Sequence, residues 1–185
     1  MPTTVDQALD RLVTDFLALY ATDDTPMPST QYDTDWPSDC YQATAEEGIT
    51  VPWQPIKQKL QHPLFEGLES ALETPVHADI KNYYGRYWSD PIPARFRDDE
   101  LSLLFIWNDK DYERLRANII GHALNKKKTK QPLTFFFGCT EPDELILSLE
   151  NSSGKILLEK PGRPPLREIA PSMTDFLNQL TPIKR

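Results

Sequence analysis

The chain has 185 residues, of which 26% are charged and 39% hydrophobic, a soluble composition that can bury one core. No apolar run approaches the roughly 20 residues of a membrane span. The first residues lack the basic and apolar regions of a secretory signal. We therefore expect a single domain over residues 1–185, with neither a membrane span nor a signal.

The net charge of −8 is unevenly distributed. Residues 1–50 hold ten acidic residues and one basic residue, Arg11, for a local charge of −9. Residues 51–105 carry −2 and residues 106–185 carry +3. An acidic segment of this kind repels nucleic acid phosphates and attracts a basic partner. A solvated surface that serves only solubility is an equally good interpretation of the charge alone.

A first helix is predicted over residues 4–21. Thr4 and Gln7 have the spacing of a capping box. One apolar face recurs at helical spacing and comprises Val5, Leu9, Leu12, Val13, Phe16 and Tyr20. This pattern predicts a surface helix that packs on a core.

Residues 23–55 have no clear period and are rich in proline and aromatic residues. A long loop without regular structure is usually functional or mobile. Four aromatic residues, Tyr32, Trp36, Tyr41 and Trp53, favour a loop that packs against the body. Residues 51–55 read as an extended segment at a sheet edge.

Two helices and a hairpin are predicted next. Leucines at 64, 68 and 72 indicate a short helix over residues 64–72. A further helix runs from Pro75 to Tyr84, with Gly85 as its end. Residues 94–97 and 101–107 are expected to pair as strands around a turn at 98–100.

The middle of the chain predicts a strand, an amphipathic helix and a second strand. Residues 101–107 are apolar except Ser102, and Asn108 or Asp109 then offers an N-cap. The helix stripe comprises Tyr112, Leu115, Ile119 and Ala123, widened by Ile120 and Leu124. Lysines 126, 127, 128 and 130 follow at the negative end of the helix dipole. Pro132 bars continuation, and residues 133–137 form the second strand.

The last part of the chain predicts two more strands and a closing helix. Leucines at 145, 147 and 149 alternate with more polar neighbours, residues 151–154 form a turn, and residues 155–159 return as a strand. Residues 161–165 form a rigid loop. Ser172 caps a helix through Leu180, with Asp175 at the capping-box position. The sum is an α+β domain: an antiparallel sheet with one inserted amphipathic helix and with N- and C-terminal helices packed on it.

Catalytic motifs are missing from the sequence. The three histidines, His62, His77 and His122, are scattered, and no HExxH, glycine-rich phosphate loop or GxSxG elbow occurs. Cys40 could act as a nucleophile only if the fold brought a histidine to it. We expect a packed thiol instead, and reduced cysteines throughout, with Cys139 buried at the end of a strand.

Other candidate sites have structural interpretations. Asp33 and Asp35 form a DxD pair that could bind a divalent cation, although such pairs are common in acidic loops. His122 lies at the edge of the buried stripe, and we expect a hydrogen-bonded boundary residue. We take the lysines at 126–130 as structural and solubilising. We expect no cofactor and no metal.

Several segments in the same order and spacing resemble the Syd family of SecY-interacting proteins, part of the SUKH superfamily. The resemblance rests on residues 120–124 leading into Lys126-Lys127-Lys128, 132–136, 176–182, Trp53-Gln54-Pro55, and Asn151-x-Ser153-Gly154. It covers nearly the full length. No single motif is diagnostic, and the segment from Asp23 to Glu47 matches least.

The resemblance implies a non-enzymatic protein at the cytoplasmic face of the inner membrane. Its partner would be SecY, the channel subunit of the protein translocase, and an acidic concave face would bind it. Cytoplasmic loops of membrane proteins are enriched in Lys and Arg, so complementary charge would select such a partner. Membrane association would then be indirect, through SecY.

We expect the binding surface in the acidic N-terminal third. The candidate residues are Asp33, Asp35, Trp36, Asp39, Glu46 and Glu47. An immunity protein that neutralises a toxin, a role found in the same superfamily, is the alternative among binding proteins. A small hydrolase or nuclease is the alternative from another class, and the acidic charge and scattered histidines argue against it.

Overall fold

The computed structural model describes residues 3–21, 27–59, 65–140 and 144–184. Its helices are α1 (Val5–Ala18), α2 (Glu66–Leu72), α3 (Ala78–Arg86), α4 (Asp109–Lys128) and α5 (Met173–Asn178). Its strands are β1 (Ser29–Gln31), β2 (Thr50–Pro52), β3 (Ile56–Lys57), β4 (Tyr87–Trp88), β5 (Ile92–Phe96), β6 (Asp99–Leu103), β7 (Thr134–Thr140), β8 (Ile146–Glu150), β9 (Ile156–Glu159), β10 (Arg167–Ala170) and β11 (Leu180–Pro182).

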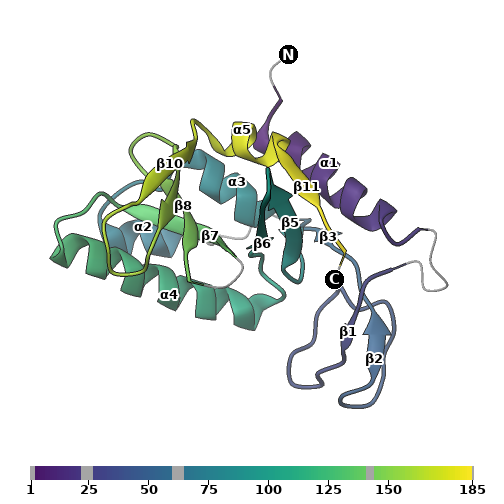
Figure 1. The fold of residues 1–185 in the computed structure, drawn as a ribbon. Coiled ribbons are helices and arrows are strands. Elements are labelled where there is room, and N and C mark those ends of the chain that lie inside the picture. Colours follow the sequence, from purple (N-terminus) through teal and green to yellow (C-terminus); the bar gives the residue numbers. More distant parts are fainter. Residues whose placement is uncertain (1–2, 22–26, 60–64, 141–143, 185) are drawn as a thin grey trace.

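A seven-stranded sheet is the centre of the molecule. Its strand order is β10-β9-β8-β7-β6-β5-β11, and all neighbours are antiparallel. The helix α4 is inserted between the sheet neighbours β6 and β7. Figure 1 shows α4 along one side of this sheet and α1 and α5 on the other. The predicted α+β class, with one inserted helix in an antiparallel sheet, is confirmed.

Two adjacent phenylalanines in β7 show how the helices share the two faces. The Phe137 ring lies 5.3 Å from that of Tyr83 in α3 and 5.7 Å from that of Phe176 in α5. The Phe136 ring lies 5.7 Å from that of His122 in α4. Because successive side chains of a strand point to opposite faces, α3 and α5 cover one face and α4 covers the other.

The helix α4 begins as predicted, because the Asn108 side chain accepts a hydrogen bond from the Asp111 N–H at 2.8 Å. Tyr112, Ile119 and Ala123 are buried as expected. Leu124 is 58% exposed, so its assignment to the buried stripe was wrong. The 100° step from Ala123 to Leu124 turns that side chain away from the sheet.

Lys126 has the structural part of the role expected for the lysines at 126–130 but not the solubilising part. Its ammonium lies 2.5 Å from the Glu159 carboxylate, and both side chains are at least 95% buried. His122 meets the Thr134 hydroxyl at 2.8 Å, so the expected boundary hydrogen bond is confirmed. Burial between α4 and β7 lowers the pKa of His122, because the charged ring is poorly solvated there.

Several predicted boundaries were wrong for local reasons. The turn of the β5–β6 hairpin is at Arg97 and Asp98, not 98–100, and Arg97 takes the left-handed conformation that a two-residue turn needs (φ 57°). The helix α3 passes through Gly85 to Arg86. The last helix ends at Asn178 because residues 180–182 pair with β5 as β11, which the sequence did not predict.

Other segments were only partly predicted. The strand β10 was not predicted, and the start of the helix expected over 64–72 lies outside the described residues. The first helix ends at Ala18, short of the expected Ala21, and its capping box at Thr4 and Gln7 is confirmed. The segment expected to be irregular contains β1 and β2, which pair in a two-stranded hairpin. Figure 1 shows this hairpin extending away from the large sheet. The corner between the hairpin and α4 is hollow, because residues of both line one cavity.

Asp10 joins α1 to the rest of the domain. Its carboxylate accepts hydrogen bonds from Arg86 at 2.5 and 2.9 Å, from the Tyr87 hydroxyl at 2.8 Å and from Lys57 at 2.9 Å. The hydrogen bonds from Arg86, chiefly, hold the pKa of Asp10 well below its usual range. This carboxylate therefore links α1 to the end of α3 and to the β3–β4 pair.

We expect Asp10→Ala to lower the free energy of unfolding by about 1.5–3 kcal/mol at pH 7, because it leaves the Arg86 guanidinium without its main partner. Asp15→Ala on the same helix is the control, since Asp15 is 49% exposed and pairs with Arg11. It should cost no more than about 0.5 kcal/mol. Urea unfolding measures both, and equal losses would contradict the linking role of Asp10. The contribution of Asp10 should be present above about pH 4 and be lost as pH falls below it.

Candidate functional site

The segment between β1 and β2 is fixed to the start of α4. The Ser38 hydroxyl donates to the Trp107 carbonyl at 2.6 Å. The Trp107 indole N–H donates to the Trp36 carbonyl at 3.2 Å, and the Asn108 amide donates to the Pro37 carbonyl at 2.8 Å. Residues 36–38 are therefore hydrogen-bonded to Trp107 and Asn108, the two residues that directly precede α4.

Aromatic packing continues this attachment towards α1. The rings of Tyr41 and Trp107 meet edge to face at 5.0 Å, and those of Trp53 and Trp107 at 5.9 Å. Trp53 in turn lies 6.0 Å from Phe16 of α1. Pairs at these distances stabilise by about 0.5–1.5 kcal/mol beyond their buried area. The expectation that the aromatic residues hold this segment against the body is confirmed.

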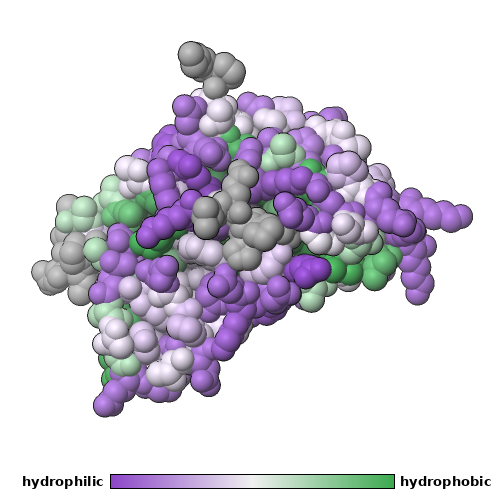
Figure 2. Space-filling view, turned by 180° about the vertical axis from the view of Figure 1, so that it is seen from behind, coloured by the Kyte–Doolittle hydropathy of each residue, from purple (hydrophilic) through white to green (hydrophobic). Residues whose placement is uncertain are grey.

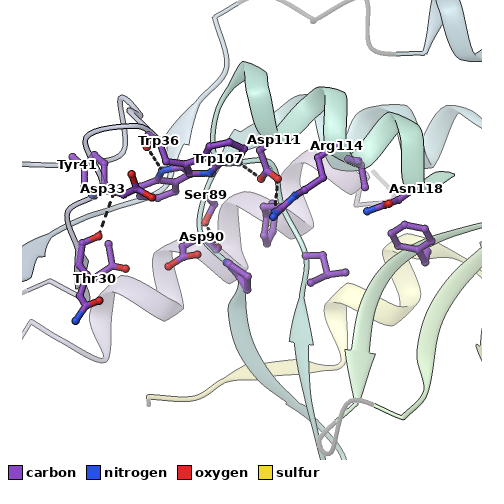
Figure 3. Close-up of a pocket in the computed structure, with 16 residues that line it drawn as sticks. Thr30, Asp33, Trp36, Tyr41, Ser89, Asp90, Trp107, Asp111, Arg114 and Asn118 are labelled. Carbon is purple, nitrogen blue, oxygen red and sulfur yellow. Dashed lines mark hydrogen bonds and ion pairs between the residues drawn. The ribbon is translucent and has the colours of Figure 1, made fainter. Parts of the chain in front are cut away.

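A cavity of about 480 Å³ lies between this segment, the start of β5 and α4 (Figure 3). This volume falls within the roughly 300–1,000 Å³ of typical ligand sites. The lining residues are Thr30, Gln31, Asp33, Trp36, Tyr41, Ser89, Asp90, Pro91, Leu104, Phe105, Trp107, Asp111, Arg114, Leu115, Asn118 and Phe136. The lining therefore combines aromatic rings with the carboxylates of Asp33, Asp90 and Asp111 and the guanidinium of Arg114.

Asp111 is the fixed carboxylate of the cavity. One oxygen accepts the Trp107 backbone N–H at 2.9 Å, and the other accepts Arg114 at 2.6 Å. Its side chain is only 10% exposed. Because both oxygens have donors, Asp111 holds the junction of strand and helix as well as lining the cavity.

Asp90 is the carboxylate with no donor. Among the described residues, none makes a hydrogen bond or an ion pair with its carboxylate. The neighbouring Ser89 hydroxyl donates instead to the backbone carbonyl of Asp90, at 2.7 Å. Burial, and secondly the charge of Asp111, raise the pKa of Asp90 from its ordinary value of 3.8 to about 6. A negative charge here is poorly solvated and would be stabilised by a cation.

The structure brings together some of the predicted site residues. Asp33 and Trp36 line the cavity. Asp39 lines a neighbouring pocket of about 360 Å³ beside Trp88 and Asn108. Asp35, Glu46 and Glu47 are exposed on the same segment, outside both linings.

Two of these acidic residues have local structural roles. An Asp33 oxygen accepts the Asp35 N–H at 2.9 Å, so the DxD pair forms a turn of its own. Glu47 accepts both the N–H and the hydroxyl of Thr34, at 2.8 and 2.9 Å. These bonds, led by the one from the Thr34 N–H, lower the pKa of Glu47. Glu47 therefore closes the segment into a loop.

Sequence reasoning missed Asp90, Asp111 and Arg114. An acidic residue in the first turn of a helix, such as Asp111, is favoured by the helix dipole whether or not it serves a site. Its position three residues after the Asn108 cap could have indicated that its side chain turns back towards the preceding strand. Asp90 has no such signal, because its burial depends on residues 33–41 folding over it.

The thiol and the histidines are separated from the cavity. Cys40 is buried as expected, and burial raises the pKa of its thiol to about 11. Cys139 is partly exposed, not buried as expected. His77 caps α3, and His122 extends from α4 to Phe136 and Thr134 of β7. Neither lines the cavity, and His62 lies outside the described residues.

The described parts of the chain contain no group of three His, Cys, Asp or Glu side chains arranged to hold a metal ion. Among the helices described, none is both long and apolar enough to cross a membrane. Figure 2 shows a face covered mainly by hydrophilic residues, with hydrophobic residues in separate small patches.

Known proteins resemble this chain over most of its length. The family model described as Syd protein (SUKH-2) matches residues 6–182. A relative from Pseudoalteromonas atlantica, named Protein Syd, is 39% identical over 184 residues that cover 98% of each chain. Relatives of the same name from Colwellia psychrerythraea and Hahella chejuensis are 40% and 41% identical; the matches cover 84% and 78% of this chain and 81% and 74% of theirs.

We expect Asp90→Asn to stabilise the domain at pH 7.5 but not at pH 4. Because the pKa of Asp90 is raised in the folded state, that state holds the proton up to a higher pH than the unfolded state does. The wild-type free energy of unfolding therefore falls as pH rises from about 4 to about 6, and this contribution is constant above pH 6. At about 1.4 kcal/mol per pKa unit, the gain for the variant at pH 7.5 is about 2–3 kcal/mol.

Urea unfolding at pH 4, 5, 6 and 7.5 measures this gain. Asp98→Asn, in the exposed β5–β6 turn, is the control for removal of one negative charge. A difference between wild type and Asp90→Asn that does not change with pH would contradict the burial of an ionisable Asp90.

Proposed function

The chain belongs to the Syd (SUKH-2) family, and we propose that it binds basic cytoplasmic loops of SecY, the channel subunit of the protein translocase, through the acidic corner between the β1–β2 hairpin and α4. Binding would let it regulate or check the assembly of SecY complexes. Its residence at the cytoplasmic face of the inner membrane would follow from this binding.

The observation that carries the proposal is a fixed acidic concavity. The segment between β1 and β2 carries five acidic residues and no lysine or arginine, and its residues 36–38 are bonded to Trp107 and Asn108. Carboxylates on a fixed segment lose little conformational freedom on binding, which favours affinity. Cytoplasmic loops of membrane proteins are rich in Lys and Arg, so their charge complements this corner.

Several acidic residues must act together. An exposed ion pair contributes only about 0.2–1 kcal/mol, so no single carboxylate accounts for stable binding. Asp35, Asp39 and Glu46 suit this role because the structure assigns their carboxylates no hydrogen bond or ion pair among the residues it describes. Trp36, partly exposed at the cavity, offers apolar surface that a partner can bury.

We propose binding without a chemical step. A thiol with a pKa of about 11 is a poor nucleophile at neutral pH. The two described histidines are engaged in contacts outside the cavity, with Asp79 and with Thr134. The cavity carboxylates are arranged to attract a cation.

We expect the triple variant Asp35→Lys, Asp39→Lys, Glu46→Lys to lose binding to SecY-containing membranes while keeping its fold. Each single reversal should weaken binding by less than about fivefold, in line with the small contribution of one exposed pair. Co-sedimentation at about 50 mM and 500 mM salt should also show weaker wild-type binding at high salt, because exposed charges are screened over about 8–10 Å at physiological ionic strength.

A matched control reverses three exposed acidic residues that line neither the cavity nor the pocket around Asp39: Glu66→Lys, Glu73→Lys, Asp99→Lys. It changes the net charge equally and should bind like wild type. Membranes depleted of SecY should bind neither the wild-type protein nor this control variant. Equal affinity of wild type and the Asp35 triple variant, at both salt concentrations, would place the partner site elsewhere.

A further inference from the structure

We propose that the cavity is a receptor for one arginine side chain of the partner, with the guanidinium seated at Asp90 beside the aromatic wall. The identity of the partner rests on the proposed function, whereas the chemistry of the cavity does not. This assignment goes beyond general attraction between opposite charges, because it selects one side-chain type and one position.

The chain already binds a guanidinium of its own at the other end of the cavity. Arg114 donates to Asp111 at 2.6 Å, and its guanidinium carbon lies 5.6 Å from the centre of the Trp36 ring. Figure 3 shows both Asp111 and Arg114 projecting from α4 towards the cavity. A carboxylate and an indole face together are the usual surroundings of a bound arginine. The lining therefore displays the chemistry that recognises this group.

The end near Asp90 repeats these elements without an occupant from the chain. Asp90 is a partly buried carboxylate whose oxygens have no donor among the described residues. Tyr41, Phe105 and Trp107 supply aromatic surface in the same lining. The lining carries three carboxylates against the single cation Arg114, which leaves a negative excess for an incoming cation.

Arg114 does not block this end. Its side chain is 67% exposed and donates to Asp111, and it has no ion pair with Asp90 in the described structure. It also places a positive charge near the entrance, which an incoming cation must approach. Removal of Arg114 should therefore leave the affinity for an arginine probe unchanged or raise it.

Binding should be linked to release of a proton. The charged and titratable groups that face Asp90 from the elements around it are Asp33, Cys40, Tyr41, Asp111, Arg114 and Lys184. Lys184 is directed to the Tyr20 ring, 4.9 Å from its centre. With a pKa of about 6, Asp90 is partly protonated at pH 5.5, and a bound guanidinium favours the ionised form. Affinity should therefore rise from pH 5.5 to pH 7.5.

Arginine should bind in preference to lysine. A guanidinium is planar, stacks on aromatic faces, donates in a fork to a carboxylate and is weakly hydrated. A lysine ammonium is a strongly hydrated point charge that gains less from aromatic walls. A purely electrostatic site would not distinguish the two.

The experiment titrates the full-length, ¹⁵N-labelled protein with N-acetyl-arginine amide and N-acetyl-lysine amide, and follows the indole N–H signals of Trp36 and Trp107 by NMR. We expect saturable shifts at the cavity with the arginine probe and at least about fivefold weaker binding of the lysine probe. Asp90→Asn should weaken arginine binding about fivefold or more at pH 7.5 and abolish its pH dependence. Glu113→Gln, next to Arg114 but outside the lining, should match wild type.

Equal affinities for the two probes, no effect of Asp90→Asn, or weaker binding by Arg114→Ala would each overturn the assignment. SecY-containing membranes separate this inference from the proposed function. If Asp90→Asn binds them like wild type while the Asp35, Asp39, Glu46 triple variant does not, the arginine receptor is wrong and the acidic docking surface stands. If the arginine probe binds selectively but the wild-type protein ignores SecY, the receptor stands and the partner is wrong.

Discussion

The attachment of residues 36–38 to Trp107 and Asn108 is the constraint on which the site depends. These two residues lie on the connection from β6 to α4, where Asn108 caps the helix and the Trp107 N–H is bonded to Asp111. The hydroxyl of Ser38 and the carbonyls of Trp36 and Pro37 bond to them. Without this attachment the β1–β2 hairpin would keep its own bonds, but its acidic residues would have no fixed position relative to α4. With it, the segment becomes one wall of a cavity whose other wall is the helix.

The same attachment places charges where they are unfavourable for stability. The walls of the cavity partly bury Asp90, and this burial raises the pKa of its carboxyl group to about 6. Under α4 the buried charge of Glu159 is compensated by Lys126 at 2.5 Å, so that pair has no need of a ligand. Asp90 has no such partner within the described structure. Groups that lower the stability of a fold are expected at functional sites, and an unpaired carboxylate suits the binding of a cation.

How far the sequence predicts this molecule depends on whether the pattern is local. The strand, helix and strand over residues 101–140 were predictable because the apolar spacing, the Asn108 cap and the lysines at the helix end agree. The strands β10 and β11 are only four and three residues long. The strand β10 pairs with the preceding strand β9, with a shift in register, and β11 pairs with the distant β5. Segments this short carry too little pattern to signal a strand. Lys126 lies three residues after Ala123 on the buried stripe, and that spacing could have shown it to be buried.

The acidic segment was identified from its charge and aromatic content, whereas the cavity was not. Asp33 and Trp36 line it, but Asp90 and Asp111 come from segments 50 or more residues away. Their approach depends on how the β1–β2 hairpin packs against α4. The charge pattern of the sequence predicts the acidic surface. Only the tertiary structure identifies Asp90, whose carboxylate has no partner among the described residues.

Site-specific photo-crosslinking tests the central claim most directly. A photoreactive amino acid in place of Asp35 reports contacts of the acidic corner, and one in place of Leu166, which is 57% exposed on the connection before β10, reports contacts of a remote surface. In SecY-containing membranes we expect crosslinks to SecY from position 35 and none from position 166. Crosslinks from position 166 alone would contradict the account, because the partner would then dock on a surface that the acidic segment does not form.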